Sequence, residues 1–461
     1  MKKRTIAIAL AALLMTACTA CGKEEMPSET TMLNGEIAAD GGFADAKKTA
    51  GAPIADAPEA AAEYDGGEAV YAPAADEAYA ADADYEAVPG DMPVRDAAAA
   101  DAACEEIAPV IDEIPGDVIN TPQAGLLTAG RWRDHDNWGF FSNLVNNDAI
   151  SFPSFGLDPT QRISVTVRNA AGEALPNAHV TLTDADGTAV WNAVSDQNGI
   201  AYVFDANGTG ASVTVTPVDG TEQSAEVPSA VTDDQGGIKK VSDRIVEVTI
   251  DTAPVLFEDM QVMFIVDTTG SMGDEMLYLQ SDFGTIAEDS GDDHTSWSVA
   301  FYKDAGDEYV TRGDHQFTGD AQAIKNQLNA ECAGGGGDEP EAVAEALNDA
   351  FSADTWASDS VKVAFLIYDA PPHAEKSAEI VQAIETAADK GIHLVPVVSS
   401  NGSRETELFG RAAAICTNGD YVFLTDDSGI GGSHLEPIIG DYEVQPLHDV
   451  IVQIVNDYRQ K

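Results

Sequence analysis

Basic residues are scarce in this sequence of 461 residues. Its 24 Lys and Arg stand against 79 Asp and Glu, so the formal net charge at pH 7 is −55. A chain of this charge is repelled by nucleic acid and by anionic membrane surfaces. We therefore expect no nucleic-acid partner, whereas divalent cations and basic partners are favoured.

Cysteine is also rare, with five in the whole chain. This number does not suggest a disulfide scaffold, and the length allows two or three domains of ~100–200 residues each. An oxidising compartment would permit a bond between Cys332 and Cys416. The sequence does not show whether their Cα atoms are close enough, so two separate thiols are an equal alternative.

Common catalytic motifs are missing. No His and Cys residues show zinc-ligand spacing, and the glycine run 334–337 lacks the Lys-Ser/Thr of a phosphate-binding loop. Ser271 lies in Thr269-Gly-Ser-Met-Gly273, which does not fit G-x-S-x-G. We therefore expect that the protein is not an enzyme.

Only the N-terminus has a long apolar run. Three basic residues come first, and the apolar run from Ile6 to Leu14 is too short to span a bilayer. Met15-Thr-Ala-Cys18 follows and resembles the bacterial lipobox, which implies a signal peptide over 1–21 and lipidation at Cys18. Cys21 is a second candidate, and an ordinary secretory signal is the alternative. We expect an extracytoplasmic protein that is lipid-anchored to the bacterial cell membrane.

Residues 22–120 are rich in Ala, Pro, Gly and acidic residues. Acidic residues outnumber basic ones there by 24 to 4. Such a composition stays solvated and extended. The sequence therefore predicts a disordered acidic tether over 22–120, acting as a spacer from the membrane.

Residues 121–255 are expected to form an aromatic lead-in segment and an all-β sandwich. Two Trp and two Phe between Trp132 and Phe141 must be packed, most simply against the domain that follows. Short alternating stretches separated by turns then predict a sandwich. The stretches 169–182 and 195–204 resemble carboxypeptidase-regulatory-like or immunoglobulin-like modules of secreted proteins.

From residue 256 the pattern changes to alternating strands and helices, which predicts a doubly wound parallel α/β sheet. The expected strands are 261–266, 296–302, 308–312 running on to Phe317, 361–368, 392–398 and 421–425. The expected helices are 274–288, 319–330, 340–351, 375–390, 404–415 and 446–459.

The first of these strands ends in a row of oxygen-bearing side chains. Asp267, Thr269 and Ser271 follow the apolar run 262–266 at alternate positions. Three such side chains on one turn can converge on a hard divalent cation, which prefers oxygen ligands. A capped turn between strand and helix is the alternative without metal.

Two further motifs are expected at the same edge of the sheet. Asp369 follows the strand 361–368, and the glycine run 334–337 leads into Asp338. In open α/β sheets, ligands bind beyond the carboxyl ends of the strands. Together the three motifs resemble the von Willebrand factor type A domain, over residues 256–459, and its metal-ion-dependent adhesion site.

That resemblance implies a site residue by residue. Asp267, Thr269 and Ser271 match D-x-S-x-S with Thr in the first Ser position, and Asp369 matches the aspartate after the fourth strand. Asp338 stands where the family usually has Thr. Mg²⁺ is the implied cation, with Mn²⁺ or Ca²⁺ as alternatives. Three carboxylates would leave the site a net charge of −1, which weakens its attraction for an acidic ligand unless Asp338 binds through water.

The resemblance also implies a protein partner at the metal face. Other side chains expected at this edge form a specificity rim, namely Asp304, His373, Asp426, Asp427 and His434. We expect a cell-surface lipoprotein that binds its partner through the cation. A structural envelope protein with a stabilising metal is one alternative, and a metal-dependent hydrolase is another.

Overall fold

The computed structural model describes residues 127–152, 155–232, 240–337, 339–428 and 433–460. The expected signal peptide, Cys18, Cys21, the acidic tether 22–120 and Asp338 lie outside these residues. Within the described part of the chain, no helix combines the length and the apolar character needed to cross a membrane.

The C-terminal part is built on an eight-stranded sheet with the order β11-β10-β9-β12-β13-β14-β1-β15. Five of these strands run parallel and alternate with helices, which confirms the expected α/β architecture. They are β9 (Asp259–Asp267), β10 (Thr295–Tyr302), β12 (Ser360–Tyr368), β13 (Ile392–Val398) and β14 (Tyr421–Thr425). The sheet is nevertheless mixed, because its outer strands are antiparallel to their neighbours. β11 (Thr311–Arg312) pairs with β10, β1 (Thr128–Trp132) pairs with β14, and β15 (Val444–Pro446) pairs with β1.

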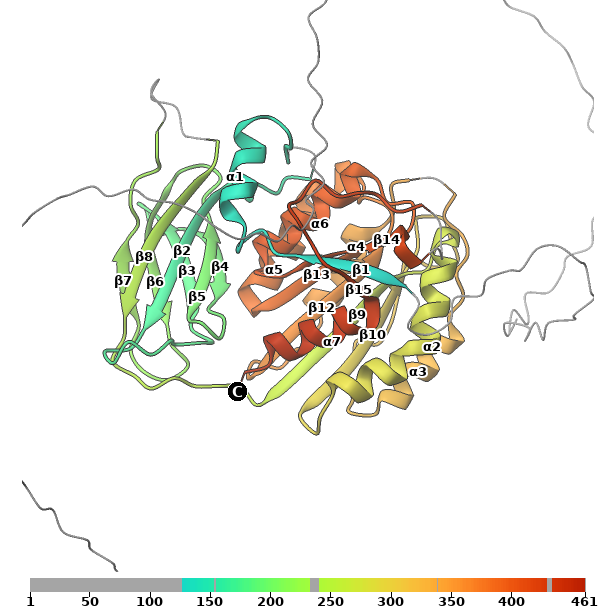
Figure 1. The fold of residues 1–461 in the computed structure, drawn as a ribbon. Helices are drawn as coiled ribbons and strands as arrows, with labels where there is room; N and C mark the ends of the chain where they lie inside the picture. Colours follow the sequence, from blue (N-terminus) through green and yellow to red (C-terminus); the bar gives the residue numbers. More distant parts are fainter. Residues whose placement is uncertain (1–126, 153–154, 233–239, 338, 429–432, 461) are drawn as a thin grey trace, which may run out of the picture. The chain divides into compact units, whose positions relative to one another are not determined.

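Helices cover both faces of this sheet because its central strands are apolar on both faces (Figure 1). Phe264 of β9 packs in the same cluster as α2 (Gly273–Ser290), α3 (Ala321–Ala330) and α7 (Leu447–Tyr458). Its neighbour Ile265 points to the opposite face. That face carries α4 (Val343–Ser352), α5 (Ser377–Lys390) and α6 (Arg404–Cys416).

Two elements are shorter than the sequence pattern predicts. The strand expected over 308–312 and on to Phe317 is reduced to β11, with a single bridge between Trp297 and Thr318 beyond it. The helix expected from residue 340 begins at Val343. Glu341 instead bridges to the segment after β12, and its N–H donates to the carbonyl of Pro371 at 3.1 Å.

The aromatic lead-in segment packs against both the α/β domain and the β-sandwich. Its first part is β1, which lies between β14 and β15 in the α/β sheet. Gly130 faces the ring of Phe423 so closely that a Cβ would lie 2.3 Å from it. Trp132 and Phe141, the latter in α1 (Trp138–Asn146), are buried in the core formed with α4, α5 and α6. The segment therefore completes the α/β domain and also contacts the β-sandwich, where His135 stacks on Tyr202 and Arg162 lies over Trp138.

Between β1 and β9 the chain forms two smaller sheets around a separate apolar core. One has the order β5-β2-β8 and the other β4-β3-β6-β7. The strands are β2 (Gln161–Arg168), β3 (His179–Asp184), β4 (Ala189–Val194), β5 (Ile200–Phe204), β6 (Gly210–Thr216), β7 (Gln223–Glu226) and β8 (Ser242–Thr249). Alternating inward side chains such as Val165, Val180 and Val213 are fully buried between the sheets.

The two cysteines of the described residues differ in state. Cys416 is a free thiol buried in α6, whereas Cys332 is disulfide-bonded. The two therefore do not pair with each other, and they are not two free thiols either.

Arg411 joins the lead-in segment to α6. Its side chain is fully buried, and its Nε and Nη2 donate to the two carboxylate oxygens of Asp134 at 2.9 and 2.8 Å. Nη1 donates to Glu407 at 3.2 Å and to the carbonyl of Ile438 at 2.8 Å. One guanidinium thus neutralises two buried carboxylates and satisfies a backbone oxygen.

Replacing Arg411 by Met should lower the free energy of unfolding by about 3–5 kcal/mol, because Asp134 would remain buried without a counter-charge and Glu407 would keep only Arg404. Denaturant titration followed by circular dichroism measures this loss. Lys240→Met is the matched control, since its pair with Asp148 is exposed and should contribute less than about 1 kcal/mol. Equal losses in the two variants would contradict the role assigned to Arg411.

Candidate metal centre

Asp267 ends β9 and organises the turn that follows. Its side chain is fully buried, and its Oδ1 accepts hydrogen bonds from the N–H and the hydroxyl of Thr269 at 2.8 and 2.7 Å. The Thr269 and Ser271 hydroxyls lie 3.2 Å apart. The three side chains predicted from the first motif are therefore brought together. The Oδ2 atom of Asp267 has no hydrogen-bond partner among the described residues.

Asp369 reaches the same place from the neighbouring strand. β12 pairs in parallel with β9, and Ile367 lies in register with Val266. The last residue of β9, Asp267, and the first residue beyond β12, Asp369, therefore meet at one edge of the sheet. Asp369 is 5% exposed, and its Oδ1 also lacks a partner within the described chain.

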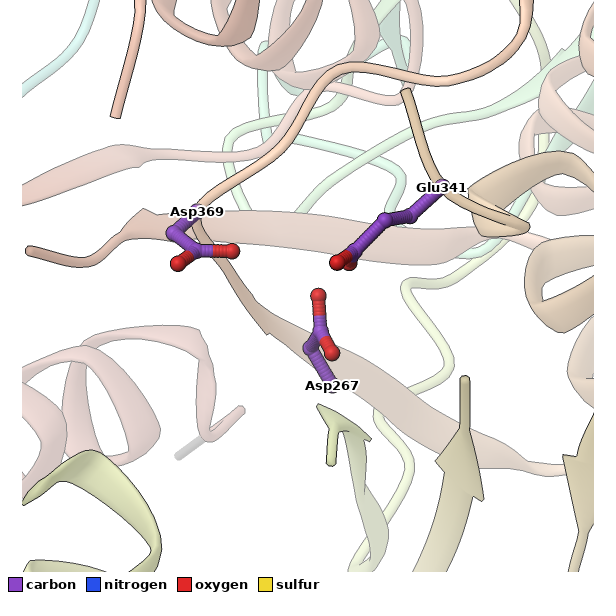
Figure 2. Close-up of side chains that lie close together, drawn as sticks. All are labelled: Asp267, Glu341 and Asp369. Atoms are coloured by element: carbon purple, nitrogen blue, oxygen red, sulfur yellow. The ribbon is translucent and has the colours of Figure 1, made fainter. Parts of the chain in front are cut away.

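Glu341 supplies the third carboxylate. It is 4% exposed, and its Oε2 is unpartnered in the described part of the protein. One oxygen from each of Asp267, Glu341 and Asp369 lies within 4.8 Å of the others. Figure 2 shows the three carboxylates pointing toward one another from three segments of the chain.

The electrostatics of this cluster fit a dication. Burial, and then the nearby Asp267 carboxylate, raise the pKa of Glu341 strongly. The same two causes raise the pKa of Asp369 to about 7. Three buried carboxylates repel one another and lack water, so their ionised forms are unfavourable without a cation. Their unpartnered oxygens, with two hydroxyls beside them, make the oxygen-rich donor set that Mg²⁺, Mn²⁺ or Ca²⁺ prefers.

Lys303 and the glycine run hold the turn in place. Lys303 is 4% exposed, and its ammonium group donates to the carbonyls of Thr268 at 2.7 Å, Cys332 at 3.3 Å and Gly334. Gly336 has φ +69°, and a Cβ on it would lie 3.1 Å from the Cβ of Thr269. Glycine is needed here because the loop passes closely over the turn in a left-handed conformation.

The sequence pattern pointed to Asp338, whereas the described structure brings Glu341 into the cluster. Asp338 itself lies outside the described residues. Glu341 was missed because Pro340 suits the first turn of a helix, so the residue after it was assigned to that helix. The signal that could have found it is an acidic residue directly after a Gly-rich run and a proline.

The five residues of the expected rim form no part of the cavity beside the carboxylates. That cavity has a volume of about 390 Å³, and its lining includes Glu341 and Asp369 of the cluster as well as Glu339 and Asn401. Instead, His373 pairs with Asp304 and His434 with Asp426, at 2.9 and 2.8 Å.

Asp426, Asp427 and His434 line a separate hollow of about 210 Å³. A chain of hydrogen bonds leads inward from it. His434 Nε2 lies 3.1 Å from the hydroxyl of Ser400, which donates to the buried carboxylate of Glu275 at 2.7 Å.

Cation binding should become tighter as the pH rises from about 5 to about 8. The folded pKa of Asp369 lies above its ordinary value of 3.8, so its proton stabilises the metal-free protein at low pH. That contribution is lost as the pH rises through about 7, where a cation can replace the proton. Calorimetry of Mg²⁺ binding in buffers of different ionisation enthalpy should detect proton release near pH 6. Asp369→Asn should reduce the number of protons released and leave the share that comes from Glu341, whose pKa is also raised. An unchanged number of protons in this variant would show that Asp369 does not carry one.

The comparisons with known proteins concern the same region. A family model described as von Willebrand factor A domain matches residues 261–430. No curated protein matches the chain.

Several solved structures are similar at low identity. A von Willebrand factor type A protein from Catenulispora acidiphila is 13% identical, with a TM-score of 0.32 and coverage of 63% of this chain and 51% of that one. This chain thus spans about half the length of that protein. The conserved hypothetical protein BatB from Bacteroides thetaiotaomicron is 16% identical, with a TM-score of 0.33 and coverage of 43% and 98%. An aerotolerance-related membrane protein from Bacteroides fragilis is 19% identical, with a TM-score of 0.30 and coverage of 43% and 99%.

These similarities are too low to carry an argument, so the assignment depends on the family match together with the strand order and the carboxylate cluster at the sheet edge. Residues 261–430 form a von Willebrand factor A domain.

Proposed function

We propose that the α/β domain binds one divalent cation through Asp267, Glu341 and Asp369, and that the cation links it to a protein partner. One observation carries the proposal: three buried carboxylates from three chain segments converge, each with an unpartnered oxygen. Thr269 and Ser271 add hydroxyl ligands from the same turn. A partner that supplies an oxygen ligand could reach the site through the adjoining cavity of about 390 Å³.

The charge of the site limits the partner's chemistry. Three carboxylates and one dication sum to −1, and the nearby ammonium of Lys303 donates to backbone carbonyls rather than to the carboxylates. The exposed side chain of Glu339 at the cavity adds further negative charge. A purely acidic ligand is therefore attracted weakly. A partner with basic side chains around its oxygen ligand suits this surface better.

The setting of the domain follows from the sequence. Lipidation at Cys18 would hold the N-terminus at the outside of the cytoplasmic membrane, and the tether 22–120 would carry the domain away from it. We favour a binding role over hydrolysis because the described residues form one candidate group of metal-ligating carboxylates, whereas two-metal hydrolysis needs a second group of ligands beside it.

Replacing Glu341 by Gln should weaken Mg²⁺ binding at least tenfold, because one of three charged ligands is lost. The same variant should stabilise the metal-free protein, because Gln removes the free-energy cost of burying an ionisable carboxyl beside Asp267. Calorimetry and thermal melts with and without Mg²⁺ measure both effects. Asp338→Asn is the matched comparison, and a larger loss of Mg²⁺ affinity there than in Glu341→Gln would make Asp338 the main ligand.

Partner binding should require the cation. Full-length protein immobilised with Mg²⁺ should retain a set of surface proteins that chelator releases and that the Glu341→Gln variant does not retain. Asp427→Asn is the control, because this exposed residue lies outside the carboxylate cluster.

Two other outcomes would replace the proposal. Recovery that is the same with chelator and with Mg²⁺ would favour a purely stabilising metal. Metal-dependent cleavage of a phosphoester that is lost in Asp267→Ala would favour a hydrolase.

A further inference from the structure

A second cavity lies at the end of the sheet opposite the carboxylates. It has a volume of about 610 Å³ and is bordered by the amino ends of β12 and β13, at Lys362 and His393, and by the end of α5. Its other wall comes from the β-sandwich, between β4 and the residues after β6. Ligand cavities often occur where two domains meet in this way.

The walls of this cavity are mostly apolar. Val194, Pro217 and Val218 contribute from the β-sandwich, and Phe257 and Trp356 from the α/β domain. Val218 is 45% exposed, so an apolar side chain stays in contact with water at this cavity. An apolar ligand group that covered these side chains would gain about 25 cal/mol of binding free energy for each Å² of apolar surface removed from water.

Direct contacts between the two walls keep the cavity open and in one shape. Asn177 and Gln460 exchange two hydrogen bonds at 2.8 and 2.9 Å. Gly391 has φ +67° and packs against Val194 so closely that a Cβ would meet it at 3.0 Å. The cavity is therefore preformed, which lowers the entropy lost when a ligand binds.

Two ammonium groups at this cavity lack carboxylate partners. Lys362 is 6% exposed, and its Nζ donates to the carbonyl of Ser360 at 2.9 Å. Lys390 donates to the carbonyls of Phe351 and Ala353 at 2.7 and 3.3 Å. Neither forms an ion pair with a described residue, although the protein has more than three acidic residues for each basic one.

Three carboxylates, those of Asp196, Asp359 and Asp389, also line this cavity, and each is exposed or bonded to another group. Asp389 pairs with His179 at 2.9 Å, and Asp196 accepts hydrogen bonds from the N–H groups of Asn198 and Ile200. Asp359 is exposed and raises the pKa of Lys362, but burial dominates and lowers that pKa to about 8. A buried ammonium without a counter-charge is costly, and an anionic ligand would remove that cost.

We infer that this cavity binds a small amphiphilic anion, a carboxylate with an apolar tail, whose head contacts Lys362 and Lys390 and whose tail covers Trp356 and Val218. The site is independent of the cation at the opposite end of the sheet. Its ligand class follows from two unpaired cations at the border of an apolar cavity.

The test compares three probes of equal tail length on the full chain. Octanoate, octanol and octylamine are titrated by calorimetry, with the fluorescence of Trp356 as a second signal and Trp356→Phe as its reference. Octanoate should bind at least tenfold more tightly than octanol, and octylamine should not bind. Lys362→Met should reduce octanoate affinity at least tenfold and leave octanol binding unchanged.

Three controls keep the outcome unambiguous. Lys325→Met removes an ammonium on α3 that does not line the cavity, and it should leave octanoate binding unchanged. Val218→Asp places a repelling charge at an exposed position, so it should weaken octanoate binding without unfolding the protein. Chelator should have no effect, which separates this site from the metal centre. Equal affinities for octanoate and octanol, no octanoate binding, or an unchanged affinity in Lys362→Met would overturn the inference.

Discussion

Repulsion among three buried carboxylates is the constraint around which the α/β domain is organised. Asp267, Glu341 and Asp369 would separate or take up protons if the chain were free to move. Parallel pairing of β9 with β12 fixes two of them, and the bridge from Glu341 to the segment after β12 fixes the third. The strain is tolerable because the same geometry is what an oxygen-seeking cation needs.

Several of the few basic residues contact buried carboxylates or backbone carbonyls. Lys303 joins the glycine run to the turn after β9 through backbone carbonyls, so it supports the carboxylate cluster without neutralising it. Arg411 neutralises Asp134 and Glu407 inside the core. Lys362 and Lys390 resemble Lys303 in this respect, because their ammonium groups donate to backbone carbonyls and form no ion pair with a described residue.

Much of the fold and part of the site could be predicted from local pattern. Apolar runs of strand length that alternate with helical periods located β9, β12 and β13, and the turn after β9 identified Asp267, Thr269 and Ser271. The predictions that failed concern contacts between residues that are far apart in the sequence. β1 joins a sheet whose other strands are more than 120 residues away, and five residues carry no signal of that pairing. Glu341 left its expected helix because of a bridge to Pro372, which only the folded chain provides.

β12 connects the two ends of the domain. It carries Lys362 near its first residue, and Asp369 directly follows its last, so the cation and the proposed anion would bind at opposite ends of one buried strand. All nine residues of β12 are buried, and it pairs with both β9 and β13, so the strand is held as part of a rigid sheet. Coupling between the ends would need a second arrangement of this sheet, which such close packing disfavours. The two sites are therefore expected to act independently, because the β-sandwich forms a wall of one and the carboxyl ends of β9 and β12 form the other.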